Sequence, residues 1–138
     1  HQLPAIRFLS NSPVIFFSYR SQDIINIADN TKLTIDILKE KKVAALSGIA
    51  DPKSFKNTLE NLGALVQKEV VFPDHYSYTH KDIQTIIRAT NGIGMIITTM
   101  KDAVKLKQFS IEHIPIYALE IGVEIENLEI FEKAVGLQ

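Results

Sequence analysis

The sequence contains no cysteine, which excludes disulfide bonds and metal sites built on thiolate ligands. It also has no apolar run close to the roughly 20 residues that a membrane-spanning helix needs. The formal net charge is -1 with the four histidines counted as neutral. A charge this small provides no strong field toward nucleic acid or a membrane surface, so we expect no nucleic-acid partner.

Several catalytic and binding motifs are also missing from the sequence. No segment has the spacing G-x-x-x-x-G-K-[ST] of a phosphate-binding P-loop. Gly92 and Gly94 precede an expected strand, so a turn accounts for them better than a phosphate loop does. The histidines show no ligand spacing such as H-E-x-x-H, and we expect no metal site. Ser47 lacks the G-x-S-x-G surroundings of a hydrolase nucleophile.

What remains is the composition of an ordinary globular domain. The chain has 138 residues, of which 46% are hydrophobic and 22% are charged, enough for one domain with a sizeable core. It begins at His1 and its first methionine is Met95. We therefore expect residues 1–138 to be a single domain cut from a longer protein, with residues 41–138 as its core and residues 1–40 as a less clearly assigned linking region.

Hydrophobic patterns predict alternating strands and helices from residue 41 onward. Capping signals support the helices: Asp51 and Pro52 are typical of a helix start and Gly63 of a helix end. The expected strands are residues 43–46, 65–72, 94–98 and 115–119, and the expected helices begin after Asp51, Thr79 and Thr99, with a terminal helix at 128–135. Upstream, we expect a strand at 14–17 and a helical remnant at 5–9, while strand and helix patterns compete over 32–39.

This alternation predicts an α/β fold: a mostly parallel sheet with helices on both faces, in a Rossmann-like three-layer arrangement. Right-handed crossovers would bring the three strand-to-helix turns, residues 48–51, 74–79 and 98–102, to one edge of the sheet. We call these three turns the rim. Because polar side chains converge there, the rim is where we expect function.

Asp74 and His75 are the most chemically promising pair on the rim. They directly follow an apolar run, expected to be a buried strand, that ends at Pro73. A histidine beside a carboxylate at a strand end can move a proton or orient the base of a partner. The alternative is that Asp74 caps a turn and His75 simply lies on the surface.

The second candidate is the segment from Thr98 to Asp102. Hydroxyl groups and backbone N–H groups at a helix start, with Lys101 beside them, could hold an anion such as phosphate. The alternative, favoured by the local spacing alone, is that Thr99 and Asp102 form a capping box and that Lys101 is merely solvated.

Three segments taken together resemble the C-terminal half of the tetraacyldisaccharide 4'-kinase family, the lipid A 4'-kinases of Gram-negative bacteria. The family typically shows G-I-[AG]-[ND]-P-x-x-F, F-x-D-H-[HY]-x-[YF] and T-T-E-K-D-x-x-K. The corresponding segments here are residues 48–55, 72–78 and 98–105, in the same order and in matching structural contexts. The resemblance is good over about residues 40–120 and looser before them.

The resemblance implies a lipid kinase that transfers the γ-phosphoryl group of ATP, with Mg²⁺, to the 4'-hydroxyl of tetraacyldisaccharide 1-phosphate. In that family the P-loop and the catalytic Asp lie in an N-terminal domain, and the present chain would contribute His75, next to Asp74, to assist that base. Thr98, Thr99, Lys101 and Asp102 would lie near substrate or nucleotide. The full-length protein would act at the cytoplasmic face of the inner membrane, attached peripherally through its N-terminal part.

The sequence also departs from the family pattern. Met100 stands where the family usually has Glu, Tyr76 takes a place often held by a second His, and the P-loop is missing. We therefore expect a soluble fragment that binds neither ATP nor metal by itself and is inactive alone. Two other hypotheses remain open: a stand-alone α/β module that binds a phosphorylated small molecule, and a structural or interaction domain.

Overall fold

The computed structural model describes residues 5–7, 14–111 and 114–126. The chain divides into two compact units, His1–Ser21 with Ile121–Gln138 and Gln22–Glu120, and each is described by itself. The helix expected at residues 128–135 lies outside the described residues.

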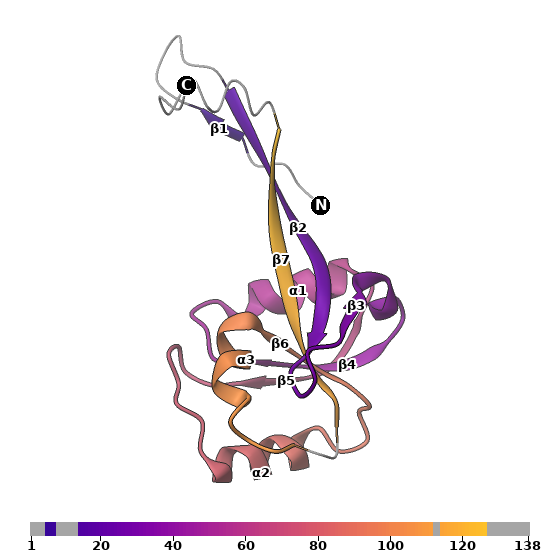
Figure 1. Cartoon of the computed structure of the whole chain (residues 1–138), viewed down its shortest axis with the longest axis vertical. Helices are drawn as coiled ribbons and strands as arrows, with labels where there is room; N and C mark the ends of the chain where they lie inside the picture. Colours follow the sequence, from indigo (N-terminus) through magenta and orange to yellow (C-terminus); the bar gives the residue numbers. More distant parts are fainter. Residues whose placement is uncertain (1–4, 8–13, 112–113, 127–138) are drawn as a thin grey trace. The chain divides into compact units, whose positions relative to one another are not determined.

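Four parallel strands form the centre of the second unit (Figure 1). They are β4 (Lys42–Ser47), β5 (Leu65–Val71), β6 (Ile96–Thr99) and β7 (Ile116–Glu126), of which the last continues into the first unit. Their order in the sheet is β7-β6-β4-β5, and each neighbouring pair is parallel. The chain therefore leaves β4 toward β5 on one side and later returns to β6 on the other.

Helices cover both faces of this sheet, as the sequence predicts. They are α1 (Pro52–Asn61), α2 (His80–Ala89) and α3 (Met100–Leu106). Phe55 and Leu59 of α1 pack in one buried cluster, and Ile83 and Ile86 of α2 pack with Leu106 of α3 in another. Figure 1 shows α1 and α2 on opposite sides of β4 and β5. The predicted Rossmann-like three-layer α/β fold is confirmed.

The side chains of strand β4 are buried on both faces of the sheet. Val43 and Ala45 belong to the cluster under α1, whereas Ala44 and Leu46 belong to the cluster under α2 and α3. All four are at most 4% exposed, because successive side chains of a strand point to opposite faces and both faces are covered.

Strand β5 differs from the prediction of a buried strand. It is the last strand in the sheet order, and most of its residues are exposed or half-buried, including Leu65 at 45% and Val71 at 51%. The apolar residues of this segment predict burial, but Gln67, Lys68 and Glu69 interrupt them. Charged residues on an edge strand discourage pairing with another chain.

The region before residue 41 contains more strand than the sequence predicts. β2 (Val14–Asn26) extends the strand expected at 14–17, and β3 (Lys32–Thr34) pairs with it antiparallel. The ambiguous segment 32–39 resolves into β3 followed by a 3-10 turn, η1 (Ile35–Leu38). The strand pattern therefore holds over the first part of the segment and the helical pattern over the second.

In the first unit, β1 (Ala5–Arg7) pairs antiparallel with the start of β2, with Ile6 opposite Ile15. The helical remnant expected at residues 5–9 is therefore wrong over 5–7, and residues 8 and 9 lie outside the described part. The spacing of Ala5, Ile6 and Leu9 fits a helix, but three residues paired to a strand are stabilised by backbone hydrogen bonds that this spacing cannot reveal.

Among residues 5–7, 14–111 and 114–126, no helix combines the length and the apolar character required to cross a lipid bilayer.

Candidate functional site

The rim lies where the sheet order reverses direction. The chain moves from β4 to β5 on one side and to β6 on the other, so the carboxyl ends of β4 and β6 flank a topological switch point. In open α/β sheets, ligands bind preferentially in the crevice at such a point. Ser47 ends β4 and Thr99 ends β6, so two of the three rim turns begin at this position.

Asp102 joins all three rim turns. Its carboxylate accepts hydrogen bonds from the backbone N–H of Gly48 at 3.0 Å, the hydroxyl of Tyr78 at 3.0 Å and the hydroxyl of Thr99 at 2.6 Å. Its side chain is fully buried. The predicted convergence of the turns is confirmed, and a single buried carboxylate holds them together.

The turns are packed so closely that Gly48 cannot carry a larger side chain without adjustment. A Cβ atom there would lie 3.1 Å from the carbonyl oxygen of Pro73, 3.2 Å from Asp102 Oδ1 and 3.2 Å from the hydroxyl of Tyr78. Glycine at this position is therefore a requirement of packing, because the β4 turn and the His75 loop meet there.

Burial raises the pKa of the Tyr78 phenol, and the charge and acceptor oxygen of Asp102 raise it further. The phenol therefore stays protonated and remains a donor to Asp102. The aromatic ring is only 5% exposed, so Tyr78 is part of the internal structure of the rim.

The two Thr-x-x-Asp segments behave differently in the structure. At α2, Thr79 and Asp82 form the predicted reciprocal capping box. At α3, the hydroxyl of Thr99 accepts from the N–H of Asp102 at 3.1 Å, but the carboxylate of Asp102 is turned to Gly48 and Tyr78. The capping-box prediction at α3 is therefore right for the threonine only.

The loop that carries His75 is organised around three aromatic rings. Phe72, Tyr76 and Tyr78 form a mutual cluster with centroid distances of 4.8, 5.1 and 5.4 Å, and such contacts stabilise by about 0.5–1.5 kcal/mol each beyond their burial. His75, which lies in the sequence between Phe72 and Tyr76, has a φ of 60°. This left-handed conformation is uncommon for any residue other than glycine.

Tyr76 is fixed at both its side chain and its backbone. Its hydroxyl donates to Asp82 Oδ1 at 3.0 Å, and its carbonyl accepts from Lys105 Nζ at 2.8 Å. The bond to Asp82 raises the pKa of Tyr76. Burial opposes ionisation of Asp82, but hydrogen bonds from Thr79 and Tyr76 outweigh it and lower the pKa of that carboxyl.

His75 itself points to solvent. Its side chain is 76% exposed, and its Nε2 lies 3.5 Å from Oδ2 of Asp74, whose side chain is 36% exposed. The two predicted residues are therefore brought together as a pair. The imidazole is accessible to a substrate or to another domain, and the neighbouring carboxylate can orient it.

The remaining candidate residues are placed less favourably for contact with a ligand. The Thr98 side chain is fully buried and donates to the Leu46 carbonyl at 2.8 Å, which joins β6 to β4. Lys101 lies exposed on the first turn of α3. Sequence reasoning missed Tyr78, Gly48 and Lys105 as partners within the rim. Their contacts join residues 24 to 54 positions apart, for which the local pattern contains no signal.

On the rim, the phosphates of a nucleotide would meet carboxylate side chains. Helix starts bind phosphate through free N–H groups and positive potential. Here Asp51 and Asp82 cap α1 and α2, and at α3 the hydroxyl of Thr99 is the cap while the Asp102 carboxylate is buried in the first turn. The described residues also contain no group of three or more His, Asp or Glu side chains suited to a metal ion. These features also count against the hypothesis of a module that binds a phosphorylated small molecule at the Thr98–Lys101 turn.

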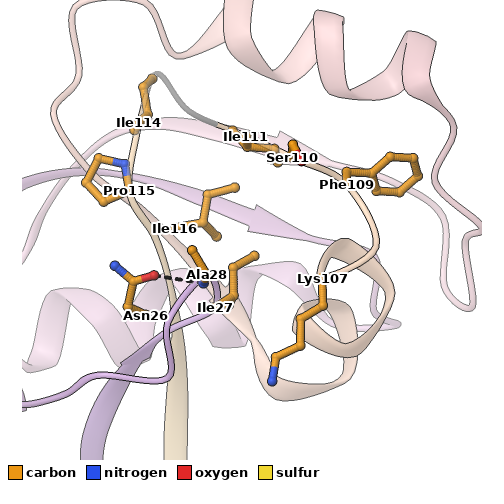
Figure 2. A pocket seen from close by; sticks show the side chains of 10 residues that line it. All are labelled: Asn26, Ile27, Ala28, Lys107, Phe109, Ser110, Ile111, Ile114, Pro115 and Ile116. Atoms are coloured by element: carbon orange, nitrogen blue, oxygen red, sulfur yellow. Dashed lines mark hydrogen bonds between the residues drawn. The ribbon is translucent and has the colours of Figure 1, made fainter.

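A cavity of about 470 Å³ lies at the opposite edge of the sheet, near the start of β7 (Figure 2). Two of its polar side chains have partners: Asn26 Oδ1 accepts from the N–H of Ala28, and Lys107 Nζ donates to Asn30. Since most of its other described lining residues are apolar, the cavity offers less chemistry than the rim does.

The fold and the rim define a class of protein: a doubly wound α/β domain that presents an exposed imidazole on the loop after its edge strand β5. The model of the family LpxK, tetraacyldisaccharide-1-P 4'-kinase, matches residues 3–136. The chain belongs to this family.

Individual relatives agree with this assignment. The chain is 37% identical over 127 residues to a tetraacyldisaccharide 4'-kinase of Desulfatibacillum aliphaticivorans, covering 89% of the chain and 34% of the relative. A kinase of the same name from Aquifex aeolicus is 31% identical over 135 residues, covering 97% and 39%. The crystal structure of LpxK from Aquifex aeolicus in complex with ATP matches with a TM-score of 0.66 and 30% identity, over 95% of this chain and 38% of that one. The chain therefore spans roughly a third to two fifths of the length of these relatives.

Proposed function

We propose that the protein containing this chain transfers the γ-phosphoryl group of ATP to the 4'-hydroxyl of tetraacyldisaccharide 1-phosphate, a step of lipid A biosynthesis. The observation that carries this proposal is the family match over residues 3–136, together with relatives named as 4'-kinases. Because the substrate is a lipid, we place the full-length protein at the cytoplasmic face of the bacterial inner membrane, attached peripherally through a part outside this chain.

The described rim is one side of the reaction site in this proposal. ATP and Mg²⁺ are held by the part of the protein outside this chain, because the capped helix starts of the rim do not fit them. The solved LpxK that resembles this chain is a complex with ATP, which supports the use of ATP by the full-length protein. The chain alone is then inactive.

In this proposal His75 assists the base that acts on the sugar hydroxyl. A carboxylate base outside this chain takes the proton of the 4'-hydroxyl, and the imidazole of His75 pairs with that base and orients it. Phosphoryl transfer depends mainly on positioning and charge stabilisation, and the 76% exposure of the imidazole makes it available to the other side of the site. Asp74, 3.5 Å away, orients the ring in turn.

The test is the variant His75→Asn in the full-length protein. Asparagine tolerates the left-handed backbone that His75 adopts, so the fold should be retained and the melting temperature should stay within about 2 °C. The turnover number should fall by roughly 10²-fold or more, as expected when an acid–base group is lost. The proposal fails if lipid phosphorylation is unchanged in a variant that is shown to be folded.

A further inference from the structure

Helix α3 holds the His75 loop at two points. The carboxylate of Asp102 accepts a hydrogen bond from the hydroxyl of Tyr78 at 3.0 Å, and the ammonium of Lys105 donates one to the carbonyl of Tyr76 at 2.8 Å. Residues three apart on a helix are neighbours on its surface, so Asp102 and Lys105 form one contact surface against the loop.

The position of the bond from Lys105 matters because the backbone of the neighbouring residue, His75, is strained. A left-handed conformation costs a residue with a side chain about 1–2 kcal/mol, and such strain persists only where the surrounding structure enforces it. His75 has φ of 60°, and the carbonyl that Lys105 binds belongs to the next residue, Tyr76. The ammonium group therefore fixes the Tyr76–Ser77 peptide group, one residue beyond the strained position.

The loop is also fixed on its other side. Pro73 comes two residues before His75, and its carbonyl oxygen lies close to Gly48, whose N–H donates to the same Asp102. His75 is thus the exposed tip of a segment that packs closely against Gly48 at Pro73 and is hydrogen-bonded to Asp102 at Tyr78.

We propose that Lys105 and Asp102 are positioning residues, which set the backbone of the His75 loop and so the direction of its imidazole. The proposal rests on the proposed function of His75. Asp102 is fully buried and the ammonium of Lys105 is bound to the loop, so neither residue contacts a substrate.

The experiment compares lysine variants of the full-length kinase. Lys105→Met removes the donor to Tyr76, and we expect kcat to fall by about tenfold or more, while KM for ATP and for the lipid changes by less than about twofold. Small misplacement of a reacting group is known to cost this much. Lys105→Arg should recover most of the lost rate, because a guanidinium can donate to the same carbonyl.

Lys107→Met is the matched control. Lys107 is the C-cap of α3 and also makes a hydrogen bond, to Asn30, but that bond is exposed and does not involve the His75 loop. Its kinetic constants should equal those of the wild type. A loss of rate in this variant similar to that in Lys105→Met would contradict the proposal, since the effect would then not depend on the loop.

A double-mutant comparison separates positioning from general damage. In a His75→Ala background, Lys105→Met should cause no further loss of kcat, because the group that it positions is gone. Tyr78→Phe, which removes only the hydroxyl bound to Asp102, should show the same lack of additivity and serves if Lys105→Met does not fold. Fully additive losses would overturn the proposal.

Two further outcomes have distinct meanings. A rise in KM for ATP or lipid at unchanged kcat would show that Lys105 binds a substrate phosphate, and would overturn the positioning role. If the wild-type protein shows no lipid phosphorylation, or if His75→Ala retains full activity, the proposed function is what fails. The two failures can therefore be told apart.

Discussion

At the scale of single residues, Asp82 and Asp102 show how the same local pattern serves two purposes. Both follow a threonine by three positions at a helix start. Asp82 turns back to cap its own helix, whereas Asp102 reaches Gly48, 54 residues away, and Tyr78. Asp102 lies beside the meeting point of three turns, where a buried N–H and a buried hydroxyl need an acceptor.

This difference predicts unequal costs of removing the two carboxylates. Asp102→Ala leaves the N–H of Gly48 and the hydroxyl of Tyr78 buried without a partner, which should lower the free energy of unfolding by about 2–5 kcal/mol. Asp82→Ala removes a half-buried cap and the acceptor of the Tyr76 hydroxyl, and should cost only about 1–2 kcal/mol because the solvent can reach these groups. Urea denaturation of both variants measures the two costs. Equal losses would show that Asp102 is only a helix cap.

The buried phenol of Tyr78 predicts a loss of stability at alkaline pH. Its pKa is raised in the folded state, whereas a tyrosine in the unfolded chain ionises near pH 10. The contribution to stability is therefore complete below about pH 10. Above that pH the unfolded state loses a proton that the folded state keeps, and stability declines as pH rises toward the folded-state pKa.

The matching measurement is the difference between wild type and Tyr78→Phe in urea denaturation from pH 8 to pH 11. We expect a constant difference up to about pH 10, followed by a decrease in the advantage of the wild type of up to about 1.4 kcal/mol per pH unit. Other tyrosines and lysines titrate in both proteins and largely cancel in the difference. A difference that stays flat to pH 11 would contradict the buried, protonated phenol.

At the scale of elements, most of the second unit could be predicted from sequence. Strand β4 is a short apolar run, and α1 has Asp51, Pro52 and Gly63 at its ends, so the sequence predicts both within one or two residues. β2 was predicted too short because residues 18–23 are mostly polar and carry no apolar alternation. Pairing with neighbouring strands supplies the order that the composition of this segment does not indicate.

The site could be predicted only in part, because some of its contacts depend on packing between segments that are far apart in the sequence. His75 and Asp74 were found because they are adjacent and follow a strand, and the rim followed from the handedness of crossovers. The contacts of Asp102 with Gly48 and Tyr78 depend on tertiary packing between separate turns. Burial of β5 was misjudged because position within a sheet is likewise a property of the whole arrangement.

The close approach of turns also predicts a contrast between two glycines. Gly48→Ala forces a Cβ atom to within 3.1–3.2 Å of the Pro73 carbonyl, Asp102 and Tyr78, and should destabilise the protein by about 1–3 kcal/mol. At Gly94 an added Cβ meets no atom within 4 Å, so Gly94→Ala should change stability by less than about 0.5 kcal/mol. Thermal unfolding of both variants tests this, and similar melting temperatures would refute the close packing of the rim.

At the scale of the whole molecule, the proposed function makes the chain one side of a site. It belongs to the tetraacyldisaccharide 4'-kinase family and spans roughly a third to two fifths of the length of its relatives. Its three helix starts are capped by their own side chains, Asp51, Thr79 with Asp82, and Thr99, while the imidazole of His75 is exposed. This combination suits a domain that contributes a reacting group and leaves the nucleotide to another part of the protein.

The most direct test of this account is transfer of labelled γ-phosphate from ATP to tetraacyldisaccharide 1-phosphate, measured for the full-length protein and for residues 1–138 alone. We predict ATP-dependent transfer by the full-length protein and no transfer above background by the 138-residue chain at equal concentration. Phosphorylation of the lipid by the chain alone would contradict the claim that its rim is only half of the site.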